Sequence, residues 1–328
     1  MTWDCTKWAT KEDPARQSDF GNLIGPYGCP RKFKYTKDGV DRDPFSVPWR
    51  RTMGTAVHHA IEVTLKSGHP PTHEEYTYMV LEGLEAERGN KPIDWKDARA
   101  ELEVDKGARM AAAVVDDMAE RAEEIVLTES SFTTCIGGFW FRGTLDILYR
   151  DRGGRLVLAD WKTGAKAISK IVRDHGYQLG IYAHAVAFGE FEDGKRVSAH
   201  PDKMYIVQTQ DMLAYTKGSR KKIWTQEEAE HWGVPMGGVA YPKPGDQKGP
   251  AWYEGQFSLE RLKRLELSCS RMVQMVRNGH FPDSMSEKCG GCGFRPQCFT
   301  EGLSMGGDEQ DRANDSLEGI DLSGLDDI

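Results

Sequence analysis

Residues 156–164, LVLADWKTG, constrain the fold more than any other stretch of this chain. They indicate a short, mostly apolar strand that ends in a carboxylate and a lysine. Residues two apart on a strand point to the same face, so Leu156 and Leu158 share a face with Asp160 and Lys162. A carboxylate beside a lysine can hold a divalent cation and still present a positive charge to an anionic reacting group.

A second strand is expected just upstream, over residues 141–149, and it carries Asp146. Residues 150–154, RDRGG, have hairpin chemistry, because glycine accepts positive φ. A hairpin centred near Gly153 places Asp146 opposite Asp160, and cross-strand neighbours lie about 4.5–5.5 Å apart at Cβ. Two aligned carboxylates would repel each other, so this pattern predicts a metal ion between them.

The order Gly143-x-x-Asp146, Asp160-x-Lys162 and Gln178-x-x-x-Tyr182 resembles the signature of the PD-(D/E)xK nucleases. More narrowly, it is similar to the RecB/AddB nuclease domain and to the CRISPR-associated RecB-like exonucleases. The resemblance covers roughly residues 26–299, and this chain has Asp160 where the family pattern often has Glu. It implies an α/β, restriction-endonuclease-like fold, with a mixed central sheet flanked by helices. It is also compatible with a phage-borne member.

Residues 53–66 are predicted to form an amphipathic helix, with Gly54 and His58 on its apolar stripe. A histidine on such a stripe is often a core residue. Gly54-x-x-x-His58, however, resembles the first motif of the RecB-like nucleases, whose histidine binds the catalytic metal. Glu62 lies one turn beyond His58, so it is either a partner that orients the imidazole or a solvated charge.

The resemblance implies a site that binds Mg²⁺ or Mn²⁺, and a mixed imidazole and carboxylate set suits Mn²⁺ at least as well as Mg²⁺. The implied metal ligands are His58, Asp146, Asp160 and the main-chain carbonyl of Trp161. The implied catalytic residues are Asp146, Asp160, Lys162, Gln178 and Tyr182. In this scheme Lys162 positions the attacking water, and the last two residues steady the lysine or the DNA.

Three cysteines near the C-terminus, Cys289, Cys292 and Cys298, follow a C-x2-C-x5-C spacing on a Gly/Pro-rich loop. The family resemblance supplies a fourth ligand, Cys29, in a Cys-Pro-Arg-Lys-Phe segment. Together they are expected to hold a structural [4Fe–4S] cluster that closes a loop of roughly 260 residues. Structural zinc is the alternative. Cys135 is expected in the core.

The predicted organisation has three parts. They are an irregular segment over residues 1–25, a nuclease domain over residues 26–300 and a disordered acidic tail over residues 301–328. A helical insert is expected at about residues 68–128, with helices over residues 72–88 and 95–128. The sheet follows from residue 131, with Glu129 just before it taken as a charge at the strand edge. A further helix is expected over residues 169–188, a strand over 204–210 and a helix over 257–277. Residues 211–250 mix basic and aromatic side chains, a pattern that fits either a groove for single-stranded nucleic acid or a solvated loop.

The net charge of −8 at first argues against a nucleic-acid partner. Residues 301–328 alone carry nine acidic residues and one arginine, so the charge of the other 300 residues sums to about zero. A neutral body can still carry a local basic groove, and the acidic tail is a possible docking segment for a protein partner. With no signal peptide and no apolar run of membrane length, we expect a cytoplasmic protein without a membrane partner.

The resemblance implies a metal-dependent DNA exonuclease that hydrolyses phosphodiester bonds at single-stranded ends, with 5′ to 3′ digestion favoured, in DNA repair or recombination. The alternatives are a catalytically inactive DNA-binding or scaffold protein of the same fold, and an endonuclease. A zinc-stapled protein with unrelated chemistry is a third possibility. Intact Asp146, Asp160 and Lys162 argue against an inactive protein.

Overall fold

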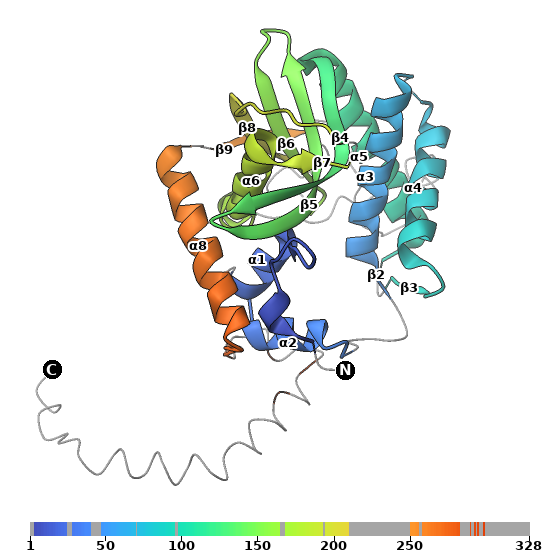
Figure 1. The fold of residues 1–328 in the computed structure, drawn as a ribbon. Coiled ribbons are helices and arrows are strands. Elements are labelled where there is room, and N and C mark those ends of the chain that lie inside the picture. The colour runs from blue at the N-terminus through green and yellow to red at the C-terminus, as the bar shows by residue number, and fades with distance from the viewer. Residues whose placement is uncertain are drawn as a thin grey trace, which may run out of the picture.

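The computed structural model describes residues 3–24, 28–40, 47–69, 71–95, 98–164, 168–192, 194–209, 250–255 and 258–282, and residues 289, 292, 294 and 298. Within this part of the chain, a mixed sheet lies between two groups of helices (Figure 1). The predicted α/β class, with a mixed central sheet flanked by helices, is therefore confirmed.

Seven of the described strands form the main sheet, in the order β7-β4-β5-β6-β8-β9, with β1 added beside β5. They are β1 (Ala15–Arg16), β4 (Ala122–Ile136), β5 (Phe139–Asp151), β6 (Leu156–Lys162), β7 (Glu190–Phe191), β8 (Lys203–Gln208) and β9 (Ala251–Gly255). Strands β2 (Val47–Pro48) and β3 (Ile93–Asp94) form a separate parallel pair.

The long β4–β5 hairpin, here called the ribbon, and strand β6 form an antiparallel meander at the centre of this sheet. Strand β8 then runs parallel to β6, so the helix between them crosses over one face, as parallel strands require. Strand β5 pairs with β6 through residues 147–150 and with β1 at residues 141 and 142. Each half of β5 therefore has a different neighbour.

The helices pack against two sides of the sheet (Figure 1). They are η1 (Cys5–Lys7), α1 (Gln17–Ile24), α2 (Pro30–Lys37), α3 (Trp49–Ser67), α4 (His73–Arg88), α5 (Ala100–Arg121), α6 (Ile168–Phe188) and α8 (Leu259–Arg277). Helices α1, α6 and α8 enclose one apolar core with the sheet, and α3, α4 and α5 enclose a second core on the other side.

The predicted helix over residues 95–128 is wrong at its C-terminal end, and so is the helical insert drawn to about residue 128. Helix α5 ends at Arg121, and the chain enters β4 at Ala122 without a loop. Residues 122–124 are good helix formers, but Ile125, Leu127 and Thr128 just after them pair with β5. Tertiary pairing has overridden the local helical pattern.

Two further expectations differ from the structure. Residues 1–25, expected to be irregular, contain the eight-residue helix α1, whose buried side chains include Phe20 and Leu23. Cys135, expected in the core, is exposed. Its neighbours Thr134 and Ile136 point inward, so strand alternation turns Cys135 outward. Helices α3, α4, α6 and α8 and strand β8 lie where the sequence predicted them.

Candidate functional site

Three acidic residues lie opposite one another on β4, β5 and β6. The β4–β5 register places Glu129 opposite Asp146. The β5–β6 register, continued by one residue beyond the Ile147–Ala159 pair, places Asp160 opposite Asp146. This is the β5–β6 alignment expected from the glycine turn. We call Glu129, Asp146 and Asp160 the acid rung.

Asp146 is held at the point where the β5–β6 ladder ends. The backbone amide of Trp161 donates to Oδ2 of Asp146 over 2.7 Å, and the carboxylate is 5% exposed. The side chain of Asp146 thus accepts an amide proton from β6 just beyond the last paired residues. This contact fixes the carboxylate and brings the backbone of Trp161 to the site.

His58 reaches the acid rung from α3. Its Nδ1 lies 2.9 Å from Oε1 of Glu129 and 3.7 Å from Oδ2 of Asp146. Gly54, one turn earlier, explains the close approach of the helix, because a Cβ there would lie 3.2 Å from Oγ1 of Thr163. The Gly54-x-x-x-His58 spacing therefore has a physical reason: the glycine lets α3 pass close to the end of β6.

Glu129, taken from the sequence as a charge at the strand edge, is instead the residue nearest to His58 in the acid rung. It adopts φ +41° within a strand, a conformation that is strained for any residue except glycine. The signal for it was present in the sequence. A two-residue Gly137-Gly138 turn, taken as the centre of the β4–β5 hairpin, pairs residue 129 with Asp146.

One imidazole and two carboxylates come together closely enough to share a cation. The ligand atoms of His58, Glu129 and Asp146 all lie within 4.8 Å of one another. Oxygen ligands with one imidazole suit Mg²⁺ and Mn²⁺, so the donors present fit a divalent ion of this kind. Asp160, predicted as a ligand, does not belong to this close group in the described part of the chain, and Glu129 takes the third place.

Asp160 instead contacts the lysine two residues further along β6. Nζ of Lys162 lies 2.5 Å from Oδ2 of Asp160, and the carboxylate is fully buried. The same strand face carries both groups, as the alternation predicted. The pair stands at the end of β6, beside the three groups that can hold the ion, so the ammonium and the candidate cation site are neighbours.

Tyr182 closes the site on the α6 side. Its hydroxyl accepts a hydrogen bond from Nε2 of Gln178 over 2.6 Å, and its ring is buried against Phe132. Burial raises the pKa of Tyr182 well above its ordinary value, and the negative charges of Asp146 and Asp160 raise it further. The phenol therefore remains protonated and can donate its proton to an oxygen of the site.

The charges of the site are strongly coupled. Burial by itself would lower the pKa of His58, but Asp146 and the hydrogen bond with Glu129 outweigh it and raise that pKa to about 9. Burial raises the pKa of Asp146, while His58 opposes this shift. In the absence of metal, His58 is therefore an imidazolium at neutral pH that neutralises part of the acid rung.

Glu62, the other candidate partner of His58, lies elsewhere. Its Oε1 forms an ion pair with Nζ of Lys66 at 2.5 Å. Between the two interpretations, the structure favours a surface charge, and Glu129 makes the contact with His58.

The four predicted cluster ligands lie at the two ends of the described chain. Cys29 precedes the first turn of α2, and the other three lie in the C-terminal loop. The guanidinium of Arg31 lies 3.9 Å from Sγ of Cys298, and the rings of Tyr35 and Phe294 are 5.6 Å apart. Phe294 and Cys298 therefore lie against α2, the helix that Cys29 precedes.

Two predicted segments fall outside the described residues. They are most of the basic and aromatic segment 211–250 and the acidic tail 301–328. Among the described helices, none combines the length and the apolar character needed to cross a membrane.

A mixed sheet flanked by helices, with a His–Glu–Asp group at its central strands and a lysine nearby at the end of β6, has the features of a nuclease that uses a divalent cation. Residues 27–299 match the family model of the PD-(D/E)XK nuclease superfamily. The chain therefore belongs to this superfamily and is a nuclease, a hydrolase of phosphodiester bonds, whose members use divalent metal ions.

Two solved structures resemble the chain. The crystal structure of SSO0001 has 11% sequence identity and a TM-score of 0.31, and the match covers 78% of this chain and 87% of that one. The crystal structure of a presumed exonuclease from Eubacterium rectale has 11% identity and a TM-score of 0.39, over 83% of this chain and 84% of that one. Likeness at this level adds nothing to the family assignment. Among curated proteins, none matches this sequence.

Proposed function

We propose that this nuclease is a RecB/AddB-like, metal-dependent DNA exonuclease that hydrolyses phosphodiester bonds at single-stranded ends, with 5′ to 3′ digestion favoured. The observation that carries the proposal is the meeting of His58 with the acid rung beside Lys162. The single-strand preference and the direction come from the resemblance of the ordered motifs to that family.

The candidate metal ligands are His58, Glu129 and Asp146, with Asp160 and the main-chain carbonyl of Trp161 as further ligands. A bound Mg²⁺ or Mn²⁺ would polarise the scissile phosphate and lower the pKa of a coordinated water. His58 has to lose its proton before it can act as a ligand, because its pKa lies near 9 in the metal-free protein.

The remaining residues bind and orient. Lys162, held by Asp160 at 2.5 Å, offers a positive charge and donor hydrogens to a phosphate oxygen or to the attacking water. Tyr182 stays protonated and, oriented by Gln178, is a donor to an oxygen of the site. The contact with the Trp161 amide keeps Asp146 in place while the substrate binds.

The four cysteines are proposed to hold a structural [4Fe–4S] cluster, with zinc as the alternative. The contact between Arg31 and the sulfur of Cys298 supports the proposal, because Arg31 is two residues from Cys29. A hydrolase needs no electron carrier, so the role of the cluster is to join the chain ends. We expect the anaerobically purified protein to contain iron and to absorb near 400 nm. Zinc without iron would instead indicate a structural zinc site.

The test of the function is digestion of end-labelled DNA with Mg²⁺ or Mn²⁺. We expect linear single strands to be degraded, with the 5′ label released first, and Lys162→Ala and Asp160→Ala to abolish this. Lys203→Ala is a matched control, because Lys203 lies at the opposite end of the neighbouring strand β8.

Other outcomes identify the alternatives. Cleavage of circular single-stranded DNA would indicate an endonuclease. DNA binding without cleavage, with either metal, would overturn the enzyme assignment in favour of a DNA-binding or scaffold protein.

A further inference from the structure

One face of the ribbon changes character at the acid rung. Before it, Ile147 and Tyr149 of β5 are buried on this face, in the core that α3, α4 and α5 enclose, whereas Leu127 and Leu148 lie in the other core. Beyond it, towards the turn, the same face carries three polar or exposed pairs. They are Ser131 with Thr144, Thr133 with Arg142 and Cys135 with Trp140. This face therefore leads from the candidate metal group onto an open surface.

Two arginines lie on this surface in neighbouring strands. Arg16 of β1 is the direct partner of Arg142 of β5, and Arg142 is the partner of Thr133 of β4. Both arginines are exposed, while Ala15 and Phe141 beside them point into the core. Neither guanidinium forms an ion pair with another residue that the structure describes. We call Arg16 and Arg142 the arginine pair.

A cavity of about 650 Å³ lies along the arginine pair. Its lining includes Gln17, Thr133 and Thr144, all of which offer polar atoms. An adjoining cavity of about 440 Å³ is lined by Glu129, and the two cavities share Ser131 and Glu192. The surface is thus hollowed from the acid rung to the arginine pair.

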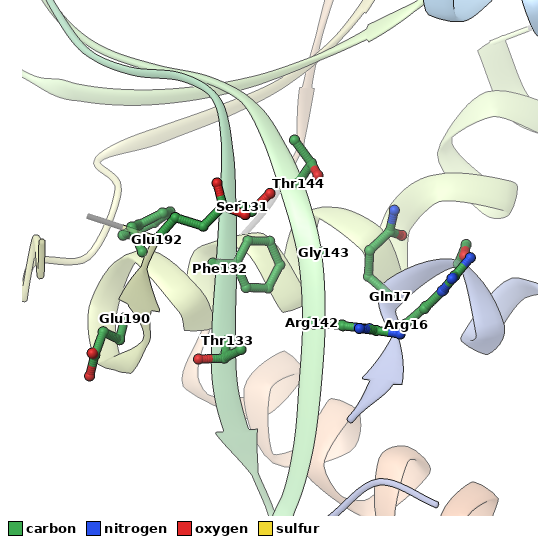
Figure 2. A pocket seen from close by; sticks show the side chains of 12 residues that line it. Arg16, Gln17, Ser131, Phe132, Thr133, Arg142, Gly143, Thr144, Glu190 and Glu192 are labelled. Atoms are coloured by element: carbon green, nitrogen blue, oxygen red, sulfur yellow. The ribbon is translucent and has the colours of Figure 1, made fainter. Parts of the chain in front are cut away.

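The two walls of the larger cavity carry opposite charges. Figure 2 shows the arginine pair on one side of the ribbon, and Glu190 and Glu192 on the other. Glu190 is the direct partner of Thr133 and forms an ion pair with Arg196 at 2.6 Å. One wall therefore attracts phosphate, while Glu192 on the other repels it and the charge of Glu190 is offset by Arg196. This contrast suits one nucleic-acid backbone better than the two backbones of a duplex.

We propose that the arginine pair is a phosphate-binding subsite for a single DNA strand whose scissile phosphate lies at the acid rung. This inference rests on the proposed function. Arg142 lies four positions before Asp146 on β5, so the subsite lies about 14 Å from the reacting phosphate. The strand has to extend that far beyond the cleaved bond to reach it.

The test is salt-dependent binding of fluorescein-labelled oligothymidylate of about 20 nucleotides, longer than the span of a single binding groove. The full-length protein is used in the Lys162→Ala background, so that the DNA survives. On a plot of log affinity against log salt, Arg16→Ala and Arg142→Ala should each reduce the slope by about 0.7, because each removes one phosphate contact from a single strand. Thr133→Glu, which leaves both arginines in place, should weaken binding through repulsion.

Arg150→Ala is the matched control. Arg150 lies on β5 at the same distance from Asp146 as Arg142 but on the other side, where it pairs with Glu124 at 3.6 Å. In the cleaving protein, KM for DNA should rise in Arg142→Ala, and the rise should shrink as the substrate is shortened below the reach of the subsite.

An unchanged salt slope in the double variant Arg16→Ala/Arg142→Ala would overturn the subsite. An Arg150→Ala variant whose slope falls as much as that of Arg142→Ala would also overturn it. The single-strand preference of the subsite would be overturned if the protein bound duplex DNA more tightly than single strands. The same conclusion would follow if Arg16→Ala and Arg142→Ala lowered the affinity for duplex DNA alone. Failure of the proposed function gives a different result, because DNA then binds through the arginine pair without being cleaved.

Discussion

The His58–Glu129–Asp146 group and the four cysteines are both candidate metal centres, and the chain builds them in opposite ways. The first is set by strand register, because two hairpin turns align the acids and one glycine admits the histidine helix. The second would join Cys29 to cysteines about 260 residues further along the chain, where Phe294 and Cys298 contact α2. A centre built on register should control chemistry, whereas one built on chain ends should control stability.

The sharpest test of this contrast is Cys29→Ser. If a cluster joins the chain ends, its loss frees a loop of roughly 260 residues, and the chain-entropy account for crosslinks gives about 5 kcal/mol of lost stability. Iron content and the unfolding midpoint in urea measure the effect, and Cys135→Ser, at an exposed cysteine, is the control. Equal stability of Cys29→Ser and the parent protein would break the comparison.

The converse test is Asp146→Asn. The amide can still accept the hydrogen bond from Trp161, so folding should be preserved, while the loss of a ligand charge should slow DNA cleavage by about 10³-fold. Initial rates with Mn²⁺ and a thermal unfolding curve separate the two effects. Asp151→Asn, in the turn of the same strand, should cleave at the parental rate. A large loss of stability in Asp146→Asn would show that this centre, too, is structural.

Glu129→Gln sharpens the assignment of the third ligand. We expect metal affinity to fall by 10- to 100-fold, in the range of groups that orient or complete a metal site, with the iron content of the protein unchanged. Manganese titration of the cleavage rate measures this affinity. Glu62→Gln is the matched control, because Glu62 is paired with Lys66 one turn beyond His58. Equal metal affinity in Glu129→Gln and the parent would return Glu129 to the role of a surface charge.

The smallest effect is a pH dependence of the metal-free protein. The folded pKa of His58 is about 9, above its ordinary value of 6.5. The imidazolium therefore adds stability that is complete below pH 6.5 and is lost as pH rises through 9, with an amplitude of about 1–2 kcal/mol after allowance for partial solvation. Urea unfolding in EDTA measures it. His58→Gln should flatten the profile in this window, and a parental slope in that variant would contradict the assignment.

Much of the fold was predictable because its signals are local. A short apolar run, β-forming residues with a period of two and the glycine turn predicted β5 and β6 and the alignment of Asp146 with Asp160, and apolar periodicity predicted α3. The boundary between α5 and β4 was not, because residues 122–124 favour a helix and pairing with β5 decides otherwise.

The site was predictable only in part. The motifs indicated His58 and Asp146, and the structure brings these two together. Glu129 was missed because its role depends on the register of a second hairpin and on a strained φ of +41°. The arginine pair has no local signal at all, since Arg16 belongs to a two-residue strand that exists only through its contact with β5.

The change of the ribbon face from buried to exposed at Glu129 and Asp146 has a kinetic consequence. Asp146 is buried in a medium of low permittivity, where attraction to a cation is strong, whereas Glu129 is half-buried and lines a cavity at the surface. An ion bound there could exchange with the solvent without any opening of the two cores. Protein stripped of its ion by a chelator should therefore regain it within the mixing time, while the fold stays closed.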